Sequence, residues 1–134
     1  MDMLKIPDPE EMLLKDLTDD IIKSFYEVYN KLGYGFLEQV YQNALFLELK
    51  KKHDCKPQYD IDVYYDGYVV GKYRADLVVD DLVILELKAA SELNEAHATQ
   101  LQNYLKATKY EVGLLLNFGK QAQIKRKVFE NKYK

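Results

Sequence analysis

The most apolar stretch of the sequence, Leu82 to Lys88 (LVILELK), is interrupted by two charged residues. Apolar runs of this length form strands buried in the middle of a sheet, where an uncompensated charge is costly. Because side chains alternate between the two faces of a strand, Glu86 and Lys88 point to the same face. A surface or cross-strand Glu–Lys pair would explain them, and so would a functional site.

A third charged residue, Asp76, lies in the preceding apolar segment (YRADLVVD). Its position relative to Glu86 depends on the register of the hairpin between the two segments. A two-residue turn would put the two carboxylates on opposite faces of the sheet. A three-residue loop over residues 80–82 pairs Val79 with Val83 and puts the carboxylates side by side. We predict this loop, or an equivalent bulge.

Asp76 and Glu86 have the chemistry of a metal site. Two carboxylates about 4 Å apart repel by roughly 4 kcal/mol at an effective dielectric constant near 20, and a divalent cation turns this repulsion into binding. Hard oxygen ligands favour Mg²⁺ or Mn²⁺, and one cysteine and two histidines make a structural zinc site improbable. With Lys88 beside them to orient a water or stabilise charge, the set suits metal-assisted cleavage of a phosphodiester.

The rest of the sequence predicts one domain of mixed α/β (α+β) class. Residues 1–16 are expected to form an N-terminal arm and residues 17–134 the domain. Apolar side chains recur at helical spacing from Thr18 to Leu32 and again after Gly35. Asn94 is a suitable cap for a helix that extends to Thr108. Strands are expected at residues 59–65, 68–79, 82–88 and 112–118, with an edge strand within residues 123–130.

Asp76, followed on the next strand by Glu86-x-Lys88, resembles the core of the PD-(D/E)XK nuclease superfamily. The predicted order of helices and strands is also that of the superfamily, whose restriction-endonuclease-like core is a mixed central sheet flanked by helices. The stretch from Gly35 to Tyr41 (GFLEQVY) matches the G-x-x-E-x-x-Y signature of a bacterial and archaeal family within it. The proline that often precedes the aspartate is replaced by Ala75. The resemblance covers residues 18–129.

This resemblance implies a metal-dependent nuclease that hydrolyses DNA phosphodiester bonds with Mg²⁺ or Mn²⁺. It assigns Asp76 and Glu86, with the carbonyl of Leu87, as metal ligands and Lys88 as the catalytic lysine. Glu38 is similar to the helical glutamate that supplements the metal site in related nucleases. Helix capping and dipole pairing are the alternative role for Glu38.

A second signature lies in the helix after Lys88. Gln100 and Tyr104 resemble the Q-x-x-x-Y motif of RecB-type exonucleases, and their spacing of four places them on one face of the helix. We expect them to position the attacking water or the DNA backbone; a solvated helix face is the alternative. His97 lies three residues earlier on that face, and both a functional and a purely structural role are open for it. Tyr41 is expected to pack in the core.

The formal net charge of −3 hides a split chain. Residues 1–20 carry seven acidic residues against two basic ones, whereas residues 120–134 carry six basic residues against one acidic residue. Such runs are commonly solvated surface, and contact with nucleic-acid phosphates is the alternative. The candidates for phosphate contact are Lys50, Lys51, Lys52, Lys125, Arg126 and Lys127.

DNA is therefore the expected partner, and the sequence leaves open a homodimer or a protein partner. The main alternative is a non-catalytic module that retains the fold and binds nucleic acid or protein; a structural or oligomerisation domain is a third interpretation. No apolar run approaches the roughly 20 residues of a membrane helix, and the acidic N-terminus lacks the apolar core of a signal peptide. We expect a cytoplasmic protein without a membrane partner.

Overall fold

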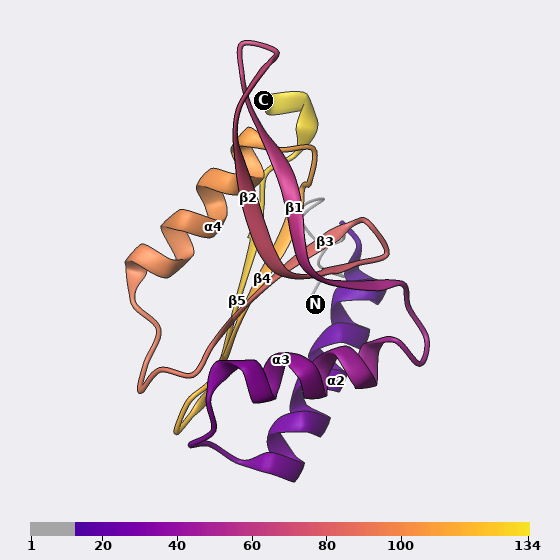
Figure 1. Ribbon diagram of the computed structural model, residues 1–134, viewed down its shortest axis with the longest axis vertical. Helices are drawn as coiled ribbons and strands as arrows, with labels where there is room; N and C mark the ends of the chain where they lie inside the picture. The colour runs from indigo at the N-terminus through magenta and orange to yellow at the C-terminus, as the bar shows by residue number, and fades with distance from the viewer. Residues whose placement is uncertain (1–12) are drawn as a thin grey trace, which may run out of the picture.

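A computed structural model of the protein describes residues 13–134 (Figure 1). The helices and strands, in chain order, are α2 (Lys15–Leu32), α3 (Glu38–Leu49), β1 (Cys55–Tyr65), β2 (Tyr68–Val79), β3 (Val83–Lys88), α4 (Glu95–Ala107), β4 (Val112–Phe118), β5 (Ala122–Val128) and the 3₁₀ helix η1 (Asn131–Tyr133). The predicted order is confirmed. The first helix begins three residues earlier than Thr18, and residues 1–12 of the predicted arm lie outside the described residues.

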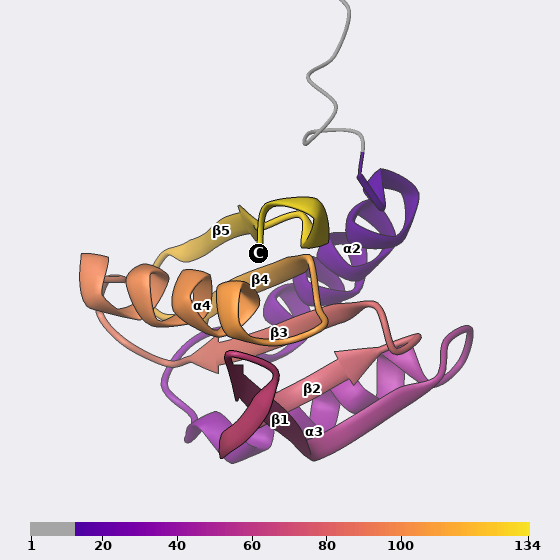
Figure 2. The same cartoon turned by 90° about the horizontal axis from the view of Figure 1, so that it is seen from above.

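The five strands form one mixed sheet in the order β1-β2-β3-β4-β5. Strands β3 and β4 are parallel and joined through α4, whereas the other neighbouring strands are antiparallel. Helices α2 and α3 cover one face and α4 covers the other (Figure 2). Every residue of β4 is buried, as expected for a strand covered on both faces. This is the restriction-endonuclease-like architecture that the sequence predicts.

Each face of the sheet has its own apolar core. The core under α2 and α3 contains Ile21, Phe25, Tyr41, Leu45, Leu85, Leu114 and Phe118. The core under α4 contains Ile61, Tyr73, Ile84, Leu101, Leu105 and Leu115. Tyr41 is fully buried, its ring stacks on Phe118 at 4.4 Å between centroids, and its hydroxyl donates to the carbonyl of Gly33 at 2.6 Å. Its predicted role in core packing is confirmed.

The hairpin between β2 and β3 has the predicted register. Val79 pairs with Val83 and Leu77 with Leu85, so residues 80–82 form a three-residue loop. Asp80 and Asp81 both have positive φ angles, of 53° and 52°, a conformation that aspartate tolerates better than most residues. The parity of this loop decides which side chains of β2 and β3 share a face.

The β1–β2 hairpin changes face part of the way along its length. Cys55 and its partner Val79 pack toward α2 and α3, whereas Tyr59 and its partner Ala75 pack toward α4. In an uninterrupted ladder, this even spacing would keep all four on one face. The pairing is interrupted where Gln58 lies opposite position 76, and Gln58 has a φ of 47°.

Helix α3 holds this interruption in place. The side-chain amide of Gln58 donates to the amide oxygen of the buried Gln42 of α3 at 2.7 Å. The outer part of the hairpin is thereby turned over the α4 side of the sheet.

None of the helices within residues 13–134 is long and apolar enough to cross a membrane.

His53, in the connection between α3 and β1, joins three parts of the chain. Its Nδ1 lies 2.8 Å from an oxygen of Asp80 in the β2–β3 loop, and its Nε2 lies 2.5 Å from Asp20 of α2. The hydrogen bond with Asp20, followed by that with Asp80, raises the pKa of His53 against the opposing effect of burial. The same contact lowers the pKa of Asp20.

We expect the replacement His53→Gln to destabilise the protein more at pH 5.5 than at pH 9. A histidine with a raised folded-state pKa contributes its full stability below its unfolded pKa of about 6.5, and loses it as the pH rises through the folded value. Urea unfolding of both proteins at the two pH values measures the difference in free energy. An equal loss at both would show that the charge of His53 contributes nothing.

Candidate active site

Strands β2 and β3 separate at Asp76, and the candidate site lies at this fork. Their pairing ends at Leu77 and Leu85, and the register, continued by one step, sets Asp76 opposite Glu86. The carboxylate of Asp76 accepts the backbone N–H of Leu87 at 2.8 Å, in place of a backbone carbonyl. Lys88 is the next residue of β3 with the same parity as Glu86 and Ile84, and Ile84 packs in the core under α4. The fork therefore opens on the α4 side.

The electrostatics of the fork centre on Glu86. Burial, followed by the negative charge of Asp76, raises the pKa of the Glu86 carboxyl to about 7. Hydrogen bonds from the Tyr73 hydroxyl and the Asp76 backbone, and the charge of Lys88, oppose this rise without cancelling it. The fork is thus short of positive charge at neutral pH. This imbalance is what a bound cation would correct.

Tyr73 is the residue of this site that the sequence did not reveal. Its side chain is 7% exposed, and its hydroxyl donates to Oε1 of Glu86. Regular alternation along β2 would put residue 73 and residue 76 on opposite faces, and the interruption opposite Gln58 removes that separation. The charged Asp76 within an apolar segment and the glutamine at position 58 were the available signals, but neither predicts a change of face.

Helix α4 contributes its two predicted residues unequally. Tyr104 stacks on Tyr73 with ring centroids 3.8 Å apart and an interplanar angle of 14°. It is therefore linked to Glu86 through Tyr73, whose hydroxyl donates to that carboxylate. Gln100 is exposed and lines a groove of about 700 Å³ between α4 and Val63 of β1. The expected cap is confirmed, since Asn94 accepts the backbone N–H of His97 at 3.1 Å.

His97 lies in the same row as the buried residues of α4. It precedes Leu101 and Leu105 by one and two turns, and it is half-buried. Its Nδ1 atom is buried and has no hydrogen-bond partner among the residues that the structure describes. The residue therefore faces the sheet more than the row of Gln100 does, in contrast to the shared face that the sequence predicted.

Glu38 is not brought to the fork. It is the first residue of α3, it is exposed, and α3 covers the face of the sheet opposite α4. Within residues 13–134, no group of three or more His, Cys, Asp or Glu side chains lies close enough to hold a metal. The expected set of three carboxylates is therefore reduced to the pair of Asp76 and Glu86.

This pair of oxygen donors suits a hard divalent cation. Mg²⁺ commonly takes one or two protein carboxylates and completes its coordination with water and substrate phosphates. The two carboxylates lie at the same fork, where burial and, after it, the negative charge of Asp76 raise the pKa of Glu86. The chemistry of the donors therefore fits Mg²⁺ or Mn²⁺ without a third acidic residue.

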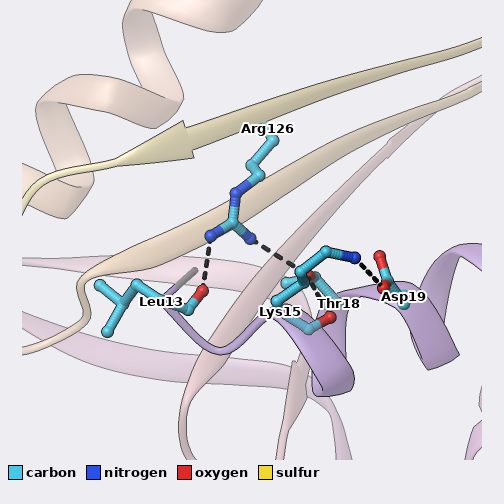
Figure 3. Close-up of polar contacts among 5 residues, drawn as sticks. All are labelled: Leu13, Lys15, Thr18, Asp19 and Arg126. Carbon is cyan, nitrogen blue, oxygen red and sulfur yellow. Dashed lines mark hydrogen bonds and ion pairs between the residues drawn. The ribbon is translucent and has the colours of Figure 1, made fainter. Parts of the chain in front are cut away.

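The C-terminal basic run divides between the two faces of β5. Lys125 pairs with Leu115, which belongs to the core under α4, whereas Arg126 pairs with Leu114 of the other core. The guanidinium of Arg126 donates to the hydroxyl of Thr18 at 3.0 Å and to the carbonyl of Leu13 at 2.5 Å (Figure 3). Its predicted contact with nucleic acid is corrected: strand alternation turns Arg126 toward α2.

The other predicted phosphate contacts have mixed surroundings. Lys127 shares the face of Lys125, since both have the same parity along β5. Lys51 pairs with Glu48 at 2.9 Å, and the ammonium of Lys50 lies 5.5 Å from the centre of the Phe46 ring. Lys50, Lys51 and the exposed Lys52 follow α3 directly before His53, which contacts the β2–β3 loop. They lie near the end of β3 that is remote from Glu86.

We expect Arg126→Met to lower the free energy of unfolding by about 1–3 kcal/mol, because it removes charge-assisted hydrogen bonds to the start of α2. Lys125→Met is the matched control, since it changes the neighbouring exposed side chain, and should stay within about 0.5 kcal/mol of the unmodified protein. Denaturant unfolding measures both values. Equal effects of the two substitutions would contradict the assignment.

We also expect Glu86→Gln to stabilise the metal-free protein, by about 1–3 kcal/mol at pH 8. A carboxyl with a raised folded-state pKa destabilises the fold above its unfolded pKa. The gain from removing it should be absent near pH 4, increase up to about pH 7, and stay constant above that. Unfolding in the presence of a chelator measures the gain, with the exposed Glu92→Gln as control. A gain independent of pH would refute this account.

Comparison with known proteins places the fold in a family. A profile of the PD-(D/E)XK nuclease superfamily matches residues 15–128. The crystal structure of SSO0001 is similar in fold, with a TM-score of 0.56 and 15% sequence identity, over 92% of this chain and 70% of that one. A search of curated proteins found no significant match. The profile spans all of the sheet and the fork, and the chain belongs to the PD-(D/E)XK nuclease superfamily.

Proposed function

We propose that the protein is a metal-dependent nuclease that hydrolyses DNA phosphodiester bonds, and that it belongs to the GxxExxY family within its superfamily. The observation that carries this proposal is the fork, where Asp76, Glu86 and Lys88 meet on one side of the sheet. The raised pKa of Glu86 supports it, because pairs of groups with perturbed pKa values concentrate at functional sites.

In this proposal Asp76 and Glu86, with the carbonyl of Leu87, hold Mg²⁺ or Mn²⁺. A bound divalent ion supplies electrostatic stabilisation of the charge that develops on the phosphate. Glu38 is not needed as a ligand in this proposal, because it lies on α3, which covers the other face of the sheet.

The chain's own residues orient the reactants. The ammonium of Lys88 orients the attacking water and stabilises negative charge on the phosphate oxygens. Such electrostatic stabilisation of the transition state is the largest contribution to the rate enhancement in many enzymes. Tyr104 and Gln100 position the DNA backbone from α4. Lys125 and Lys127, on the α4 side of the sheet, contact more distant phosphates. Lys50 to Lys52 form a separate candidate patch at the end of α3.

The test is a cleavage assay on single-stranded DNA, double-stranded DNA and RNA with Mg²⁺ or Mn²⁺. We expect DNA cleavage that a chelator abolishes and that Glu86→Gln and Lys88→Ala each reduce by at least about 100-fold. Lys120→Ala, at an exposed lysine in the β4–β5 turn, is the matched control and should retain full activity. Cleavage that survives both Glu86→Gln and Lys88→Ala would refute the assigned roles.

The second candidate is a non-catalytic module that binds nucleic acid or protein through the same fold. The absence of a third acidic side chain at the fork, among the described residues, favours it. It predicts no cleavage with either metal, together with DNA binding that weakens steeply as salt rises. The intact Asp76, Glu86 and Lys88 favour the nuclease, because binding alone requires none of them.

A further inference from the structure

We propose that Tyr73 is a positioning residue, whose hydroxyl holds one oxygen of Glu86 so that the other faces the metal ion, and whose ring is held by Tyr104. The proposal deepens the function proposed above and rests on it. It assigns to Tyr73 no contact with the substrate. It also gives Tyr104 a definite task, which is to fix the ring of Tyr73.

The contacts of Tyr73 are those of a fixed donor. The side chain is 7% exposed and lies in the apolar core under α4, where its strand neighbour Ile61 also packs. The hydroxyl, at the end of this buried ring, donates to Oε1 of Glu86. A carboxylate that ligates a metal is commonly oriented by a hydrogen bond to its other oxygen, and the loss of such a bond weakens metal binding.

Helix α4 holds the ring of Tyr73 through the side chain of Tyr104. Tyr104 lies parallel to it, with centroids 3.8 Å apart and an angle of 14° between the planes. Tyr104 is followed by the fully buried Leu105, which anchors this turn of α4 on the sheet. The position of the helix is thereby transmitted to Glu86 through one aromatic contact and one hydrogen bond.

The arrangement depends on the change of face in the β1–β2 hairpin. Without the interruption opposite Gln58, residues 73 and 77 would share a face, and Leu77 packs toward α2 and α3. The interruption puts Tyr73 under α4 instead. The same local feature therefore separates Asp76 from the ladder and supplies the donor for Glu86.

The test compares Tyr73→Phe with Tyr110→Phe. Tyr110 is 2% exposed, belongs to the same core, and its hydroxyl donates to a carboxylate oxygen of Asp81 at 2.6 Å. Both substitutions remove one hydroxyl–carboxylate bond and keep the ring. Only the first bond involves a proposed metal ligand. The measurement is the Kd for Mn²⁺ of the full chain, by calorimetric titration without DNA, together with the melting temperature of each variant.

We expect Tyr73→Phe to raise the Kd for Mn²⁺ by about 10–100-fold, as for other groups that orient a ligand. Tyr110→Phe should change the Kd for Mn²⁺ less than twofold, while it lowers the melting temperature by about as much as Tyr73→Phe does. Tyr104→Leu, which keeps an apolar side chain and removes the stacked ring, should raise the Kd in the same direction. It provides a second variant if Tyr73→Phe does not fold.

An unchanged Kd in Tyr73→Phe, or in Tyr104→Leu when only that variant folds, overturns the positioning role. If the unmodified protein binds Mn²⁺ and cleaves DNA in that case, the proposed nuclease function stands without it. Absence of Mn²⁺ binding by the unmodified protein overturns both proposals together. An equal rise of the Kd in Tyr73→Phe and Tyr110→Phe would assign the effect to general loosening of the core, and would also overturn it.

Discussion

The three-residue loop between β2 and β3 is the constraint on which the rest of the site depends. Because side chains alternate along strands, one residue more or fewer in this loop would move Glu86 and Lys88 away from Asp76. Leu77 and Leu85, which pair across the same hairpin, would then lose their shared place in the core under α2 and α3. The register is therefore set by the burial of apolar side chains, and the carboxylates follow it.

The fork combines this register with a local loss of pairing. Asp76 replaces a backbone acceptor for the N–H of Leu87, which leaves β2 free to diverge over α4. The consequence is an acidic pair in a half-buried position, where burial and the charge of Asp76 raise the pKa of Glu86. Such an arrangement opposes stability in the absence of a cation. Superfamily membership and this electrostatic strain support the same function.

Local patterns were sufficient for most of the fold. The period of apolar residues located the helices and strands, and the buried strand β4 followed from its unbroken apolar run. The prediction of phosphate contacts was wrong for Arg126, because it considered only the charges of the run and not the strand on which they lie. The run from Lys125 to Lys127 looks uniform in the sequence, but on a strand it divides between two faces, and Arg126 binds the start of α2.

Sequence alone was enough to identify Asp76, Glu86 and Lys88 as candidates, because charges within buried strands require compensation and strand parity relates them to one another. Tertiary structure decided which other residues join them. Tyr73 reaches Glu86 only because the β1–β2 hairpin changes face opposite Gln58, and Glu38 stays apart because α3 covers the other face. Both results depend on contacts between elements distant in sequence, such as that of Gln42 with Gln58, which no local periodicity records.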